Sequence, residues 1–85
     1  MYEVVFKRMA EKSIAQLPGN TYQRVTRAID NLSEEPRAPG CIRLRGRDDW
    51  RIKVGDYRVV YGIDDGRRMV EILHIAHRRD IYRQG

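Results

Sequence analysis

Basic side chains are concentrated in the middle of the sequence, where their types and spacing suit the binding of phosphate. Six Lys or Arg residues stand against three Asp residues between positions 41 and 58. Gly and Asp at 55–56 separate two runs of alternating apolar residues, which predicts a two-residue hairpin turn of type II′. In that register Lys53 lies opposite Arg58, and Arg51 shares their face of the sheet. Because two like charges opposite each other cost stability, we expect this face to hold an anion.

The next turn places the last strand beside this charged hairpin. We expect Asp and Gly at 65–66 to form the centre of that turn. The register then puts Tyr61 opposite Val70 and Arg58 opposite Leu73. Whatever follows the last strand therefore emerges near the cationic side of the sheet.

The C-terminal segment supplies further groups for the same surface. If it forms one helical turn, Arg78 and Tyr82 stand at i and i+4 on one side of that turn. Tyr82 could equally fold back on the core. His74 falls in the core register and is expected to be a packing residue. His77 is a candidate general acid or base, with hydrogen bonding that positions the tail as its alternative.

These residue types match what strand cleavage by the 2′-hydroxyl of RNA requires. The reaction needs a base for the 2′-hydroxyl proton, cations for the pentavalent phosphorane and an acid for the leaving 5′-oxygen. An aromatic ring can also stack on a splayed base. Lys53 and Tyr82 can exchange protons, whereas three members serve only as electrostatic clamps: Arg51, Arg58 and Arg78. The alternative is a solvated outer face on which long basic side chains protect an exposed sheet.

The elements that must position these residues are short and divide into two halves. Residues 2–6 read as a strand, and apolar residues then recur at helical spacing from 6 to 17. A second helix is expected after Asn20, which can act as its N-cap with Gln23 completing a capping box, and it ends before Pro36. From residue 42 the period becomes alternating and predicts four strand segments, the first short. The predicted fold is α+β, in the order β-α-α-β-β-β with a possible extra short strand, and two antiparallel helices cover one face of a mainly antiparallel sheet.

Composition bounds the class of protein. Eighty-five residues form one domain, 1–85, and 41% hydrophobic content is too high for a disordered chain. The net charge of +5 favours a polyanionic partner. One cysteine, Cys41, cannot form an internal disulfide, and no Cys/His spacing suits zinc, so neither a metal nor a cofactor is expected. No apolar run is long enough to span a membrane, so a cytoplasmic protein is expected.

In combination, RLRG, DDWRIKVGDYRVVYGIDDG and the ending HRRDIYR resemble the RelE family within the RelE/ParE superfamily of bacterial toxins. The resemblance covers nearly the whole chain and implies a ribosome-dependent endoribonuclease that cleaves messenger RNA in the A site without metal. It also implies a cognate antitoxin, which the charge balance predicts to be acidic. Carried over by position, the family's catalytic residues fall at Arg51, Lys53, Arg58, Arg78 and Tyr82. Contacts to messenger and ribosomal RNA are expected from four arginines: Arg43, Arg45, Arg47 and Arg79.

A second class of function shares the same fold. A ParE-like toxin would block DNA gyrase by binding and would need no nuclease site. RNA binding without cleavage is a third possibility. The feature that separates these classes is the cluster of Lys, Arg and Tyr around a space of phosphate size, which cleavage requires and gyrase inhibition does not.

Overall fold

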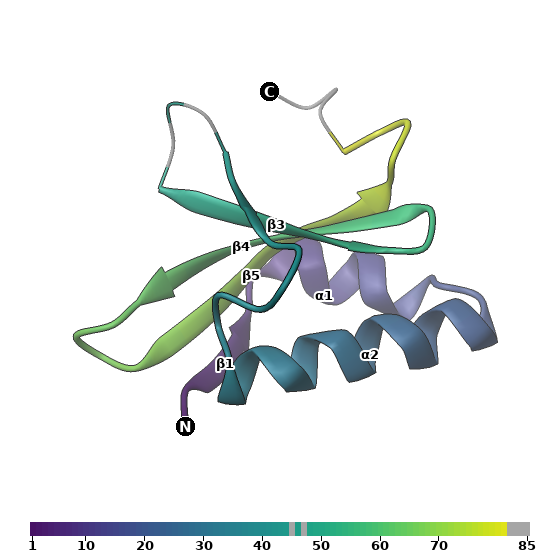
Figure 1. Ribbon diagram of the computed structural model, residues 1–85. Helices are drawn as coiled ribbons and strands as arrows, with labels where there is room; N and C mark the ends of the chain where they lie inside the picture. Colours follow the sequence, from purple (N-terminus) through teal and green to yellow (C-terminus); the bar gives the residue numbers. More distant parts are fainter. Residues whose placement is uncertain (45, 47, 82–85) are drawn as a thin grey trace.

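The computed structural model describes residues 1–44, 46 and 48–81. Its elements follow one another as β1 (Glu3–Phe6), α1 (Arg8–Ala15), α2 (Gly19–Glu34), β2 (Ile42–Arg43), β3 (Asp49–Val54), β4 (Tyr57–Asp64) and β5 (Met69–His77). The strands form one sheet in the order β1-β5-β4-β3-β2. Strand β1 pairs with β5 in parallel, and all other neighbours are antiparallel. Both helices lie on one side of this sheet (Figure 1), which confirms the predicted α+β architecture.

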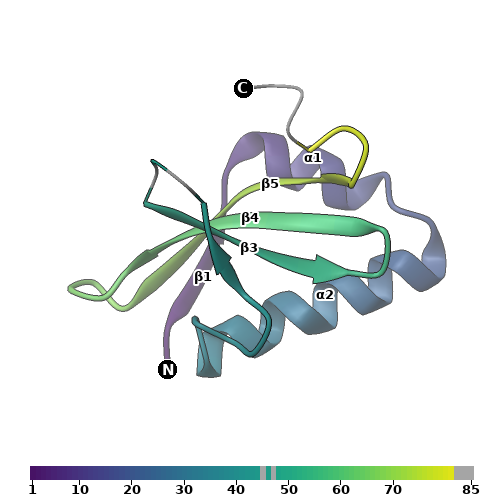
Figure 2. The same cartoon turned by 45° about the horizontal axis from the view of Figure 1, so that its top comes forward.

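The core fills the space between the helices and the sheet. Its fully buried members come from both layers: Ala10, Val25, Ile29, Leu32, Val59, Tyr61, Val70 and Ile72. The helix side of each strand supplies alternate residues, as a half-buried sheet requires. We call the opposite side of the sheet the outer face. Figure 2 shows β3 and β4 running side by side across the sheet. Helix α2 lies below β3 in this view and is farther from the viewer.

Helix α2 begins two residues earlier than the sequence predicted. Pro18 is its N-cap residue, with φ −61° and ψ 154°, and the Pro18 carbonyl accepts a hydrogen bond from the Tyr22 amide at 2.7 Å. Pro18 makes no side-chain capping bond. The capping role predicted for Asn20 was therefore wrong, because Asn20 already lies inside the first turn. Among the described helices, none is both long and apolar enough to cross a membrane.

The hairpin between β3 and β4 has the predicted register. Lys53 pairs with Arg58, and Arg51 pairs with Val60. Gly55 adopts φ +60°, the conformation that a type II′ turn needs at its first central position. A Cβ at this position would lie 3.0 Å from the Arg24 guanidinium of α2. Both the backbone conformation and the close neighbour therefore favour glycine here.

The loop between β4 and β5 is longer than predicted. Asp64 pairs with Met69, so residues 65–68 form a four-residue connection in place of a two-residue turn. Arg68 adopts φ +52° and donates its amide to the Asp65 carbonyl at 3.3 Å. Tyr61 consequently pairs with Ile72, two residues beyond the predicted partner. A shift of two leaves the same residues on each face, because side chains alternate with a period of two.

A β-bulge then exchanges the faces of the second half of β5. Tyr61 pairs with Ile72 but Val60 pairs with His74, so Leu73 is the extra residue. Arg58 consequently lies opposite Ala76, three residues from the predicted Leu73. His74 shares the outer face with Val60, and the prediction that it packs in the core was wrong.

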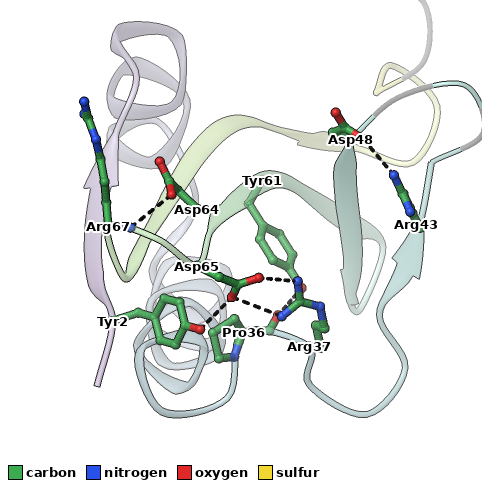
Figure 3. A network of polar contacts seen from close by, with 9 residues as sticks. All are labelled: Tyr2, Pro36, Arg37, Arg43, Asp48, Tyr61, Asp64, Asp65 and Arg67. Atoms are coloured by element: carbon green, nitrogen blue, oxygen red, sulfur yellow. Dashed lines mark hydrogen bonds and ion pairs between the residues drawn. The ribbon is translucent and has the colours of Figure 1, made fainter.

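Polar contacts fasten the end of the sheet to the loop after α2 (Figure 3). The Tyr2 hydroxyl donates to Asp65 at 2.6 Å, and the Arg37 guanidinium donates to the other Asp65 oxygen at 2.9 Å. The Tyr61 hydroxyl, fully buried, donates to the Pro36 carbonyl at 2.7 Å. These bonds hold the pKa of Asp65 below its ordinary value, because Arg37 and Tyr2 favour the carboxylate. The Asp65 carboxylate therefore serves a contact within the fold. The hairpin turn at residues 55–56 lies at the other end of β4.

Candidate functional site

Two basic side chains of the hairpin lie side by side on the outer face. The Cα atoms of Lys53 and Arg58 are direct cross-strand partners, and the Lys53 side chain is exposed. The Arg58 guanidinium is turned toward the hairpin end, where its Nη1 donates to the Gly55 carbonyl at 3.1 Å and to the Tyr57 carbonyl at 3.0 Å. These bonds hold Arg58 in place, whereas the Lys53 side chain is exposed to solvent.

The tail brings a third basic residue to the same turn. Beyond the end of β5, the Arg78 amide donates to the Asp56 carbonyl at 2.7 Å. The Arg78 Nε also lies 4.0 Å from the Asp56 carboxylate, and both side chains are largely exposed. We call Lys53, Arg58 and Arg78 the hairpin cluster. The structure therefore brings together three of the predicted site residues at one end of the sheet.

The turn that follows Arg78 is the predicted single helical turn. The amides of Asp80 and Ile81 both donate to the His77 carbonyl, at 2.8 and 3.1 Å. Ile81 is only 5% exposed and is not part of the core cluster under the helices. Figure 1 shows this segment rising on the side of the sheet away from α1 and α2. Tyr82, the predicted end of this turn, lies outside the described residues.

Arg51 occupies the predicted face but is not solvated there. The side chain is 9% exposed, and its Nε and Nη1 find no hydrogen-bond partner among the described residues. An arginine keeps its charge at any physiological pH, and an unpaired buried charge is costly. If Arg51 acts as the predicted electrostatic clamp, it does so from beneath the surface of the protein. Lys53, by contrast, is exposed to solvent.

His77 lies on the helix side, away from the hairpin cluster. Its ring meets the Tyr57 ring edge-on, with centroids 5.5 Å apart, and its Nδ1 accepts a hydrogen bond from the Arg79 amide at 3.2 Å. It lines a hollow with Ser13 and Gln16 near the end of α1. Because Tyr57 belongs to the core register, His77 cannot face the same surface as Lys53. Its predicted acid–base role loses its geometric basis, whereas its alternative role in positioning the tail agrees with these contacts.

Two of the four arginines predicted to contact RNA lie in the described part of the chain. Arg43 pairs in register with Trp50, whose ring faces the helix side, and its guanidinium donates to Asp48 at 2.7 Å (Figure 3). It therefore lies away from the outer face. Arg79 is exposed in the tail turn. Arg45 and Arg47 lie outside the described residues.

Sequence reasoning missed one outer-face group, His74. It pairs with Val60 and lies two strands from Arg51. Burial lowers its pKa below the ordinary histidine value, which favours the neutral imidazole. The bulge at Leu73 that turns His74 outward follows from how two strands pair, and the sequence around it carries no glycine or proline to signal it.

Residues 4–82 match the family model described as the ParE toxin of the type II toxin-antitoxin system parDE. The chain belongs to the RelE/ParE superfamily of toxins. Toxin RelG of Mycobacterium tuberculosis is 35% identical over 85 residues, which cover 98% of each chain. This toxin also resembles RelE in the archaeal RelE–RelB complex of Pyrococcus horikoshii, with 30% identity and a TM-score of 0.81 over 91% of this chain and 94% of that one. The Escherichia coli RelBE complex gives the same TM-score at 25% identity, over 91% and 96% of the two chains.

The comparisons confirm the family and the fold that the sequence predicted. The family model carries the ParE description, whereas the similar solved chains are RelE toxins in complex with RelB. A shared fold does not decide between two activities. The choice between them must come from the residues on the outer face of this toxin.

Proposed function

We propose that this toxin is a ribosome-dependent endoribonuclease that cleaves messenger RNA in the ribosomal A site by attack of the 2′-hydroxyl. The observation that carries the proposal is the hairpin cluster, in which Lys53, Arg58 and Arg78 surround one two-residue turn. Three cations in this arrangement match the charge that develops on a pentavalent phosphorane. Asp56 offsets only part of that charge.

The roles divide by chemistry within the cluster. Arg58 and Arg78 act as fixed clamps on the phosphate oxygens, since guanidinium groups do not give up their protons. Lys53 is exposed and carries a transferable proton, so it serves the 5′-oxygen that leaves. The cyclic 2′,3′-phosphate and the 5′-hydroxyl are the products of this reaction. The ribosome supplies the orientation of the messenger that a small, open surface cannot supply alone.

The proposal is tested by mapping the 5′ ends of a messenger incubated with purified toxin, with and without programmed ribosomes. We expect new ends within codons only when ribosomes are present. Messenger that stays intact in both reactions contradicts the nuclease proposal. Metal chelation with EDTA, applied after ribosome assembly at a concentration that leaves the ribosomes intact, is not expected to change the cleavage rate.

Inhibition of DNA gyrase is the second candidate, favoured by the ParE description of the family model. It predicts that the toxin blocks supercoiling by purified gyrase while leaving messenger uncut. A supercoiling assay with the same protein preparation therefore separates the two activities. Under this alternative the hairpin cluster serves as a docking surface.

We also propose that an acidic antitoxin neutralises this toxin. The support is the net charge of +5 together with the RelB-bound form of the similar RelE chains. Calorimetric titration with the product of the neighbouring gene is expected to show tight binding that weakens as salt rises, because surface charges are screened. Binding that is absent, or unchanged between 50 mM and 500 mM salt, contradicts the electrostatic part of this proposal.

A further inference from the structure

Two residues with shielded, unpartnered nitrogens, buried Arg51 and half-buried His74, lie in one row across the middle of the outer face. Arg51 on β3 and His74 on β5 both pair with Val60 on β4, so the three form one row across the sheet. Adjacent strands are about 4.8 Å apart, which puts the Arg51 and His74 backbones roughly 10 Å apart. Val60, only 5% exposed, lies between them as an apolar floor.

The polar atoms of this row lack partners. Within the described part of the chain, no hydrogen bond reaches Arg51 Nε, Arg51 Nη1 or His74 Nδ1, and all three atoms are shielded from water. Nearly all buried polar groups in proteins are hydrogen-bonded. The two unpartnered Arg51 nitrogens are donors on a permanent cation, so an anion would satisfy them. The His74 nitrogen can accept a proton from a hydroxyl group. A phosphodiester with a neighbouring hydroxyl offers both partners.

The charged neighbours of His74 strengthen this preference. Arg58 lies on the same face, two residues before Val60 on β4, and Arg51 lies on β3. Glu71, an acid on the same face of β5, is already paired, because its carboxylate lies 3.4 Å from the Lys7 amine past the end of β1. The charged groups that share this face with His74 are therefore mainly cations, and an oxyanion above Val60 would lie between Arg51 and His74.

We propose that this row, here called the Val60 subsite and formed by Arg51, Val60 and His74, binds the scissile phosphodiester, and that His74 Nδ1 accepts the proton of the attacking 2′-hydroxyl. The inference rests on the proposed nuclease function. In the reaction the 2′-oxygen forms a bond to phosphorus while its proton moves to His74 Nδ1. The bond from phosphorus to the 5′-oxygen breaks, and Lys53 gives a proton to that oxygen. His74 then returns its proton to Lys53 through solvent, which restores both groups.

Admission of the phosphate requires the side chains around the subsite, or what covers them, to move. The nitrogens are shielded from water in this conformation.

The chain offers its own control, because its two histidines lie on opposite faces of the sheet. In an NMR titration of both imidazoles, inorganic phosphate is expected to raise the pKa of His74 and leave the His77 signals in place, since a bound anion favours the charged ring. The Arg51→Met variant is expected to lose this response. Unmoved His74 signals, or equal movement of both rings, would overturn the subsite.

Cleavage kinetics test the proton transfer separately. In single-turnover reactions on programmed ribosomes, His74→Gln is expected to lower the rate by about 10²-fold to 10⁴-fold. It is also expected to remove the wild-type rise of rate with pH below about 6.5, where a base with a lowered histidine pKa loses its proton. His77→Gln is expected to keep that rise. A His74→Gln variant with wild-type rate and profile overturns this inference, whereas a wild-type protein that cuts no messenger overturns the proposed function and leaves the NMR result to decide the subsite.

Discussion

Replacing Arg58 or Arg78 by alanine is expected to lower ribosome-dependent cleavage by at least about 10²-fold, the usual loss when one preorganised electrostatic group is removed from a transition-state site. Both residues are held at the hairpin turn, Arg58 by its guanidinium bond to the Gly55 carbonyl and Arg78 by its backbone amide bond to the Asp56 carbonyl. That fixation means that little reorganisation is needed when charge develops on the phosphate. The measurement is single-turnover cleavage of messenger on programmed ribosomes, with toxicity in cells as a second readout.

The fold should survive both substitutions. Arg58 faces a like charge at Lys53, so its removal also relieves a repulsion. Arg78 is 60% exposed and its ion pair with Asp56 spans 4.0 Å, a geometry that contributes little to stability. Arg27→Ala, on the exposed side of α2, is the matched control and is expected to cleave at the wild-type rate. Full activity in Arg58→Ala would remove that residue from the mechanism.

Local patterns were sufficient to predict the fold and the face of the sheet on which Arg51, Lys53 and Arg58 lie. The turn at 55–56 specifies its own register, because a two-residue loop leaves only one pairing of the residues beside it. The pairings of Lys53 with Arg58 and of Arg51 with Val60 followed from that turn alone, and the structure confirms both. The last strand is apolar on both faces, which agrees with its position beside β1 inside the sheet.

The second half of the outer face could not be derived in the same way. The loop at 65–68 ends in Arg68 at φ +52°, a conformation that sequence reasoning would assign to Gly66. The bulge at Leu73 lies just past Ile72, the last residue of β5 that pairs with β1. One extra residue exchanges the faces of His74 and Ile75, which is why the sequence placed a candidate catalytic base in the core.

The burial of Arg51 also lay beyond the sequence. Alternation correctly predicts the face on which its side chain lies, but it cannot predict how much of that face other parts of the chain cover. The difference matters for mechanism, because an exposed arginine is a weak electrostatic group in water whereas a buried one exerts a stronger field. Arg51 therefore differs in kind from Lys53, although the two residues stand next but one on the same strand.

The second prediction with a large expected effect is that Arg51→Met stabilises the fold and lowers the rate of cleavage. Arg51→Met retains an apolar stem of similar length and removes a buried charge whose Nε and Nη1 have no partner in the described chain. A buried polar group without a partner costs about 1–3 kcal/mol, so the free energy of unfolding is expected to rise by roughly that amount. For a chain of this size, each kcal/mol corresponds to an increase in Tm of about 4–8 °C. Cleavage on programmed ribosomes is expected to fall by at least about 10²-fold, since a cation opposite the phosphate is lost.

Lys53→Met is the control for this prediction, because it changes a basic residue on the same strand and face that is already exposed to water. It is expected to lose cleavage and to gain at most about 0.2–1 kcal/mol, the usual size of a cross-strand pair effect, from relief of the repulsion with Arg58. The pair of variants, measured by urea unfolding and by single-turnover cleavage, separates the cost of burying a charge from the benefit of having one at the site. A loss of stability in Arg51→Met would mean that the guanidinium is satisfied in the folded protein, and the Val60 subsite would then lack the unmet charge on which it depends. A gain would indicate that this toxin retains a destabilising arginine because the phosphate it binds is its missing partner.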